Sequence, residues 1–200
     1  MAIHMVNRLL AEFGKTYAEE AGIALRDKPA PLYQLLVLAT LQSARIRSDI
    51  ATAAARELFS AGYRTPQRML AATWQQRVDA LGRGGYARYN ESTATRLGEG
   101  AELLLGNWRG DLRRMRSPHR DVQKFPGIAE TGADAFCREA QAVWPNLRPY
   151  FGQRALDAAK RHNLPTDPHR LAGLVPASQL AALATALVRS EITSAGTPSR

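Results

Sequence analysis

Residues 122–133 read Val-Gln-Lys-Phe-Pro-Gly-Ile-Ala-Glu-Thr-Gly-Ala, and this stretch decides how the whole chain is interpreted. The Pro126-Gly127 pair ends one helical pattern, and a second helical pattern begins at Glu130. Gly127 can take backbone conformations that are closed to other residues. Ile128, which has small neighbours, is suited to anchor a turn in the core. The pattern therefore predicts two helices joined by a tight hairpin.

A hairpin of this form exposes the backbone N–H groups that open its second helix. The N-terminal end of a helix carries partial positive charge, so these amides attract a phosphate group. Contacts of this kind hold a DNA backbone without reading its bases. We interpret residues 122–133 as a helix-hairpin-helix that binds DNA, with an ordinary Pro-Gly turn between two helices as the alternative.

The bulk composition is that of a globular protein with a large basic excess. The chain has 200 residues, 45% of them hydrophobic, which is enough for one sizeable core or two small ones. Its formal charge of +9 favours a polyanionic partner, nucleic acid before anionic lipid, over a charge that serves solubility alone. No apolar run reaches the ~18 residues of a membrane span. We expect a cytoplasmic, nucleoid-associated monomer without a membrane partner.

The chemistry-bearing residue types exclude several kinds of site. A single cysteine, Cys137, allows neither an internal disulfide nor an iron–sulfur cluster held by four cysteines. The four histidines have no metal-ligand spacing with one another. No Walker loop, dinucleotide fingerprint or nucleophile elbow occurs. We therefore expect no metal and no cofactor.

Nearly the whole chain has helical periodicity, and no stretch alternates long enough for a strand. Thr65-Pro66, Ser117-Pro118 and Asp167-Pro168 each place a capping side chain before a proline that suits a first helical turn. Thr73 and Gln76 fit a capping box. The predicted fold class is all-α. The expected helices are Val6–Tyr17, Leu32–Ala44, Ile50–Phe59, Glu130–Val143, Ala155–Arg161 and Ser178–Ile192, with a disordered tail at Ser194–Arg200.

Five landmarks follow one another along the chain. They are an apolar helix with Leu-Gln-Ser-Ala-Arg at its end (Leu36–Arg45), a short helix (Thr65–Leu70), the segment Gly85–Asn90, the hairpin (Phe125–Ala133) and the turn Trp144-Pro145. In type and order they resemble the helix-hairpin-helix (HhH-GPD) DNA glycosylase superfamily, in particular its endonuclease III branch. The hairpin aligns with that family's Leu-Pro-Gly-Val-Gly-Arg-Lys-Thr-Ala. The resemblance covers residues 31–171.

The resemblance implies two helical domains with a DNA cleft between them. A six-helix domain that carries the hairpin would span residues 28–143, and the N-terminal helix, within residues 1–27, would pack with the C-terminal helices of residues 144–200. The implied partner is double-stranded DNA, damaged or distorted. Arg45 aligns with an intercalating glutamine and could fill a gap in the base stack, hold a phosphate, or be a simple surface residue. The residues expected to contact DNA are Arg45, Arg116, Arg120, Lys124, Pro126, Gly127, Ile128, Ala129, Thr131 and Gly132.

The catalytic positions of the family carry other residue types in this chain. The lysine that forms a Schiff base aligns with Thr131, which cannot form an imine, so β-lyase activity is not expected. The aspartate shared by active branches aligns with Gly152. Candidate substitutes are Asp134, Asp157 and Glu130, although Asp157 is most simply a solvated helix residue and Asp134 a local cap or pair. The catalytic residues therefore stay unknown at this stage.

Basic residues recur at helical spacing ahead of the hairpin. Pro118 interrupts any single helix through them, which predicts two short stripes that face phosphates. A solvated arginine face is the alternative. The residues of these stripes are Arg109, Arg113, Arg116, Arg120 and Lys124.

Three functions remain open. The first is a DNA-binding protein of base-excision-repair type with weak or no glycosylase or lyase activity, because the hairpin is kept while the catalytic positions are replaced. The second is an active monofunctional glycosylase that uses a non-standard carboxylate or relies on a labile, already cationic substrate. The third is a helical protein-interaction module. The aromatic residues that could stack on a base, or belong to the core, are Tyr86, Tyr89, Tyr150 and Phe151.

Overall fold

Helices make up the structure, a computed structural model that describes residues 1–195, and no strand occurs in these residues. The all-α prediction is confirmed. No helix of the described residues is both long and apolar enough to cross a membrane. The helices are α1 (Ala2–Phe13), α2 (Tyr17–Glu20), α3 (Pro29–Gln42), α4 (Ser48–Ser60), α5 (Pro66–Ala71), α6 (Trp74–Arg83), α7 (Asn90–Trp108), η1 (Leu112–Arg114), α8 (Pro118–Val122), α9 (Glu130–Ala140), η2 (Pro145–Leu147), α10 (Gln153–Arg161), α11 (Pro168–Ala172), η3 (Ala177–Gln179) and α12 (Leu180–Ala195).

The helices start where the sequence signals place them, with one difference. The Thr65 side chain accepts from the Arg68 N–H, and Thr73 and Gln76 form the predicted capping box. The Asp167 side chain caps α11. Ser117 precedes α8 but its side chain makes no capping hydrogen bond. Its backbone N–H instead donates to the Asp121 carboxylate, 3.1 Å away.

Some helix ends differ from the predicted ones. The first helix stops at Phe13, because Gly14 closes it with an N–H that donates to the Leu10 carbonyl, 2.9 Å away. A separate short helix, α2, then starts at Tyr17. The expected tail at Ser194–Arg200 is helical in its first two residues, which close α12, and its remainder lies outside the described residues.

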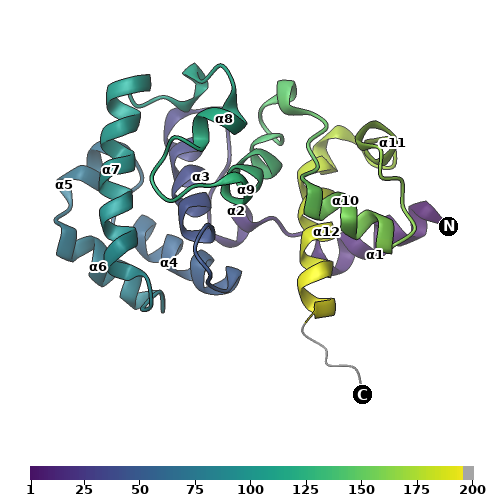
Figure 1. Ribbon diagram of the computed structural model, residues 1–200, viewed down its shortest axis with the longest axis horizontal. Helices are drawn as coiled ribbons and strands as arrows, with labels where there is room; N and C mark the ends of the chain where they lie inside the picture. The colour runs from purple at the N-terminus through teal and green to yellow at the C-terminus, as the bar shows by residue number, and fades with distance from the viewer. Residues whose placement is uncertain (196–200) are drawn as a thin grey trace. The chain divides into compact units, whose positions relative to one another are not determined.

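The chain divides into two compact units, of which the first to be described here spans residues 18–136. Its central element is α3, whose buried side chains point to every side, as expected of a helix that lies inside a core. It packs against α4, α7 and η1 (Figure 1). The Tyr86 hydroxyl donates to the Leu41 carbonyl, 2.8 Å away, and satisfies the C-terminal end of α3.

The other unit consists of residues 1–17 and the chain from residue 137 on. In it α12 packs against α1 and α10 (Figure 1). Val6, Leu9 and Phe151 belong to its buried core. The Tyr17 ring lies under the guanidinium of Arg189, 4.0 Å from the ring centroid. The domain bounds expected from the sequence, at residues 28 and 143, stay a prediction.

Candidate nucleic-acid interface

The predicted hairpin is formed by α8 and α9 and the turn between them. The turn closes through the Ile128 N–H, which donates to the Phe125 carbonyl at 3.1 Å. Gly127 has φ +83°, in the left-handed region that favours glycine. Phe125 and Ile128 are buried, 3% and 4% exposed, and anchor the turn in the core. Gly127 and Ile128 thus have the places in the turn that the sequence predicts.

The start of α9 faces outward. Gly127, Ala129, Glu130 and Thr131 are all exposed. The first helical hydrogen bond runs from the Ala133 N–H to the Ala129 carbonyl. The N–H groups ahead of it therefore have no partner within the helix. An anion at such a helix start gains about 0.3–1 kcal/mol from the helix dipole.

Close packing holds the hairpin against neighbouring helices. A Cβ at Gly132 would lie 2.1 Å from the Ser43 hydroxyl oxygen at the end of α3. A Cβ at Gly127 would lie 2.7 Å from the Arg96 Cδ and 3.1 Å from its Nε. The half-buried Arg96 side chain of α7 therefore lies directly over the turn and adds a positive charge there. Sequence reasoning missed Arg96, because it stands in a different helix and carries no spacing signal toward the hairpin.

Arg45 lies exposed in the segment that follows α3. It stands two residues beyond Ser43, which packs against Gly132. Two residues of chain span at most about 7 Å, so the backbone of Arg45 is close to the start of α9. The structure brings this predicted contact residue near the hairpin, and its role toward DNA stays a prediction.

The two residues that the resemblance aligns with the family's catalytic positions, Thr131 and Gly152, lie at helix starts. Thr131 is exposed in the first turn of α9. Gly152, in the other unit, caps the start of α10 with an extended backbone, at φ −65° and ψ 165°. Asp157 lies exposed on α10 and accepts a hydrogen bond from the Gln153 amide, 2.8 Å away. This arrangement is typical of a solvated helix residue.

Asp134 links the two helices of the hairpin. Its carboxylate lies 3.0 Å from the His119 Nε2. The other ring nitrogen of His119 lies 3.3 Å from the Gln123 amide nitrogen. If that amide donates to Nδ1, then Nε2 carries the proton that is donated to Asp134. The local pairing expected of Asp134 is therefore present, between α8 and α9.

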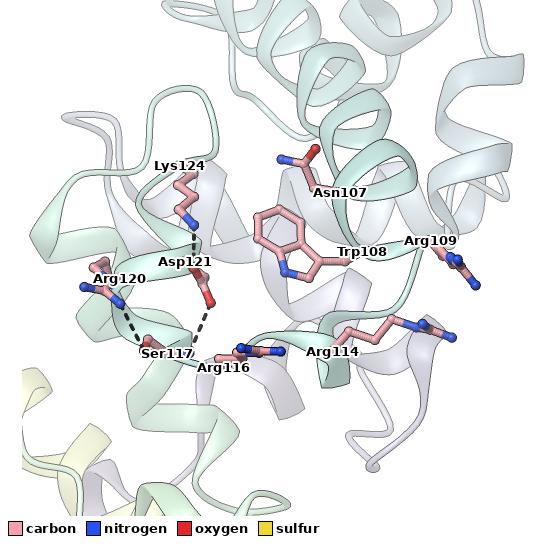
Figure 2. A pocket seen from close by; sticks show the side chains of 9 residues that line it. All are labelled: Asn107, Trp108, Arg109, Arg114, Arg116, Ser117, Arg120, Asp121 and Lys124. Carbon is pink, nitrogen blue, oxygen red and sulfur yellow. Dashed lines mark hydrogen bonds and ion pairs between the residues drawn. The ribbon is translucent and has the colours of Figure 1, made fainter.

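A pocket of about 560 Å³ opens beside the hairpin (Figure 2). Five cationic side chains line it, and α8 and the turn after it contribute two of them. The other lining residues are polar apart from Trp108. The Trp108 ring lies with Arg120 and Lys124 on one side and Arg109 and Arg114 on the other (Figure 2). The cationic residues are Arg109, Arg114, Arg116, Arg120 and Lys124. We refer to this set as the arginine pocket.

One residue of the predicted basic stripes lies outside the pocket, and the role of the stripes toward phosphates stays a prediction. Arg113 does not line the pocket, because its guanidinium pairs with the Asp111 carboxylate at 2.8 Å. Hydrogen bonds and charge from Arg113 hold the pKa of Asp111 below its usual value, despite an opposing effect of burial. Arg114, which was not predicted, lines the pocket instead. The short 3₁₀ turn of η1 changes the helical spacing on which the prediction rested.

Lys124 is fixed by its neighbours. Its ammonium lies 2.7 Å from the Asp121 carboxylate and 5.5 Å from the centre of the Trp108 ring. Burial raises the pKa of Asp121, but hydrogen bonds from Lys124 and the Ser117 N–H outweigh that effect and keep this pKa below its usual value. Trp108 stacks on Phe125 with ring centroids 5.6 Å apart. Lys124, Trp108 and the hairpin turn thus form one packed unit.

For two of the four aromatic residues, the alternative of a place in the core is confirmed. Tyr86 is fully buried and Phe151 is 7% exposed, so both belong to the core. Tyr89 is half-buried, and the Arg88 guanidinium lies 5.3 Å from its ring centroid. The backbone of Tyr150 is held by the Gln141 side chain.

Among the described residues, no three histidine, cysteine, aspartate or glutamate side chains gather as a metal ion would require.

Comparison with known proteins identifies the fold. No family model and no curated protein matches the chain. A trapped endonuclease III–DNA covalent intermediate, an estranged-adenine complex, superposes with a TM-score of 0.56 and 16% identity, over 100% of this chain and 90% of that one. A non-covalent endonuclease III–DNA complex superposes with a TM-score of 0.54 and 16% identity, over 94% and 85%. The chain therefore has the endonuclease III fold, as the resemblance predicts.

Proposed function

We propose that the chain binds duplex DNA through the α8–α9 hairpin, acting as a helix-hairpin-helix, and that its glycosylase and lyase activities are weak or absent. The observation that carries the proposal is the bend itself. Ile128 anchors it from inside while the residues on either side of Ile128 are exposed. The amides of the first turn of α9 are thus available to a phosphate group.

The charges around the bend support a phosphate partner. Arg96 lies over Gly127, and Arg45 is close to Gly132 through Ser43. Glu130 is the one opposing charge in the first turn of α9. The two solved structures compared above are endonuclease III–DNA complexes. Neither amide nor guanidinium contacts depend on a base, so binding without sequence preference is expected.

The residues at the catalytic positions support weak or absent chemistry. Threonine at position 131 offers no amine for a Schiff base, and glycine at position 152 offers no carboxylate. The candidate substitutes Asp134 and Asp157 each have a local partner, His119 and Gln153. A single well-placed acid or base supplies about 10²–10⁴-fold in rate. The loss of both groups removes most of the usual mechanism, while the binding surface needs neither of them.

Binding measurements on intact, mismatched and abasic duplexes test the proposal. Fluorescence anisotropy at low salt is expected to show binding to all three, which weakens steeply as salt is raised. Reduction with borohydride in the presence of abasic DNA is expected to trap no covalent complex. Absence of binding to every duplex at low salt would end the proposal. A trapped complex would contradict the claim that lyase activity is weak or absent.

An active monofunctional glycosylase is the second candidate, and the Asp134–His119 pair favours it. This pair lies on the hairpin, one helical turn beyond Thr131, and its side chains are about one-third exposed. A carboxylate in this place could orient a water molecule. Excision from a panel of damaged duplexes, lost in Asp134→Asn and kept in Asp157→Asn, would establish this function over the first.

A further inference from the structure

We propose that the arginine pocket holds phosphates of a nucleic-acid strand, as a second contact separate from the hairpin amides. This inference rests on the proposed function and extends it from one contact with DNA to two. Its members come from the end of α7, from η1 and the residues after it, and from α8 and its turn. The pocket adjoins the hairpin, because Arg120 and Lys124 belong to both.

The pocket has an uncompensated positive charge. Of the described residues, Asp121 is the only carboxylate that lines it, and Lys124 already pairs with that carboxylate. Arg120 has only a long contact, 3.5 Å, with the Ser117 hydroxyl. The other lining arginines are Arg109, Arg114 and Arg116. Within the part of the chain that the structure describes, none of these three forms an ion pair. Four guanidinium groups that repel one another favour a bound polyanion.

The backbone at Arg109 points to a use for its side chain. Arg109 ends α7 in the left-handed conformation, at φ 53° and ψ 35°. Glycine takes this conformation without strain, whereas a residue with a Cβ does not. Glycine would therefore cause less backbone strain at position 109, yet the position carries an arginine whose guanidinium lines the pocket.

The arrangement of the cations fits a strand better than a single small anion. Arg120 and Lys124 lie on one side of Trp108, and Arg109 and Arg114 extend on the other (Figure 2). Trp108 is only 9% exposed and is stacked on Phe125, so it forms a rigid floor. Cations that are spread along a hollow can each meet a successive phosphate of one backbone.

The test compares two double variants with equal changes in charge. Arg114→Gln with Arg116→Gln removes two exposed pocket arginines. Arg56→Gln with Arg68→Gln removes two exposed arginines of α4 and α5, which do not line the pocket. The dissociation constant for one duplex is measured over a range of salt concentrations. The pocket variant is expected to bind about tenfold more weakly, and the slope of log K against log salt is expected to fall by about 1–2, while the control changes little.

A third variant separates binding from folding. Arg109→Gly suits the left-handed backbone, so the fold is expected to be at least as stable as the wild type in a thermal melt. Its affinity for DNA is nevertheless expected to fall several-fold. A drop in stability with unchanged affinity would show that Arg109 serves only the fold, and would count against the pocket.

The outcomes distinguish this inference from the proposed function. If the wild type binds DNA and the pocket variant matches the control in affinity and slope, the inference is overturned and the hairpin proposal stands. If the wild type binds no DNA, both fail. Inorganic phosphate and anionic vesicles serve as further probes. One of these probes could bind as tightly, per phosphate, as an oligonucleotide does, and could lose that binding in the pocket variant. The ligand of the pocket would then be a small anion or a membrane surface and not a nucleic-acid strand, and the inference would be overturned.

Discussion

Gly132 of α9 lies so close to Ser43 at the end of α3 that a Cβ at residue 132 would stand 2.1 Å from the Ser43 hydroxyl oxygen. The absence of a side chain at residue 132 is therefore what lets the start of the hairpin helix pack on α3. Gly132→Ala is expected to destabilise the protein by about 1–3 kcal/mol, the usual cost of overpacking. Urea unfolding measures this change.

The matched second variant is Ser43→Gly. It removes the hydroxyl that a Cβ at residue 132 would meet, so it is expected to restore part of the lost stability when it is combined with Gly132→Ala. A double-mutant cycle gives the coupling between the two sites. Simple additivity of the two changes would show that they do not pack as described.

Gly127→Ala tests the turn. The substitution strains a backbone at φ +83° and pushes on the Arg96 side chain, which can move because it is flexible. We expect a loss of about 1–2 kcal/mol in stability, with a roughly tenfold loss of DNA affinity as the amides shift. Gly62→Ala is the control, because Gly62 has φ +92° and open space around it. An equal loss of DNA affinity in both variants would contradict a special role of the turn.

Glu130→Gln tests the charge at the helix start. Glu130 is exposed in the first turn of α9, where it competes with a phosphate for the same positive potential. Removing its charge is expected to tighten DNA binding about three- to tenfold, while the helix loses about 0.3–1 kcal/mol of dipole stabilisation. Glu91→Gln, in the first turn of α7, is the control and is expected to leave affinity nearly unchanged. Weaker binding by Glu130→Gln would place the phosphate elsewhere.

His162 predicts a pH dependence of stability. Burial and then the charges of Arg8 and Arg161 lower the pKa of His162, whose ring lies 3.0 Å from the Ser190 hydroxyl. The unfolded chain therefore takes up a proton at a higher pH than the folded protein, near pH 6.5. The contribution of His162 to the free energy of unfolding is therefore present above that pH. It is lost as the pH falls through the lower pKa that His162 has in the folded protein. Urea unfolding from neutral to mildly acidic pH should show this decline, and His162→Gln should flatten it.

Local sequence patterns were enough to predict the all-α fold and the hairpin. The Pro-Gly turn, the buried Ile128 and the proline-led helix starts depend on residues near one another in the chain. Arg96 over Gly127 and Ser43 against Gly132 could not be predicted, because they depend on how α7 and α3 pack on the hairpin. The exchange of Arg113 for Arg114 in the pocket arises from the Asp111 pair and the 3₁₀ turn, which helical spacing alone does not indicate.

The central claim is that the outward amides at the start of α9 hold a DNA phosphate. The most direct measurement is an amide-resolved NMR titration of the ¹⁵N-labelled protein with a short duplex at low salt. We predict that the amide signals of Gly127, Ala129, Glu130 and Thr131 shift first and furthest, and return when salt is added. Binding that leaves these amides unmoved while signals elsewhere shift would contradict the claim.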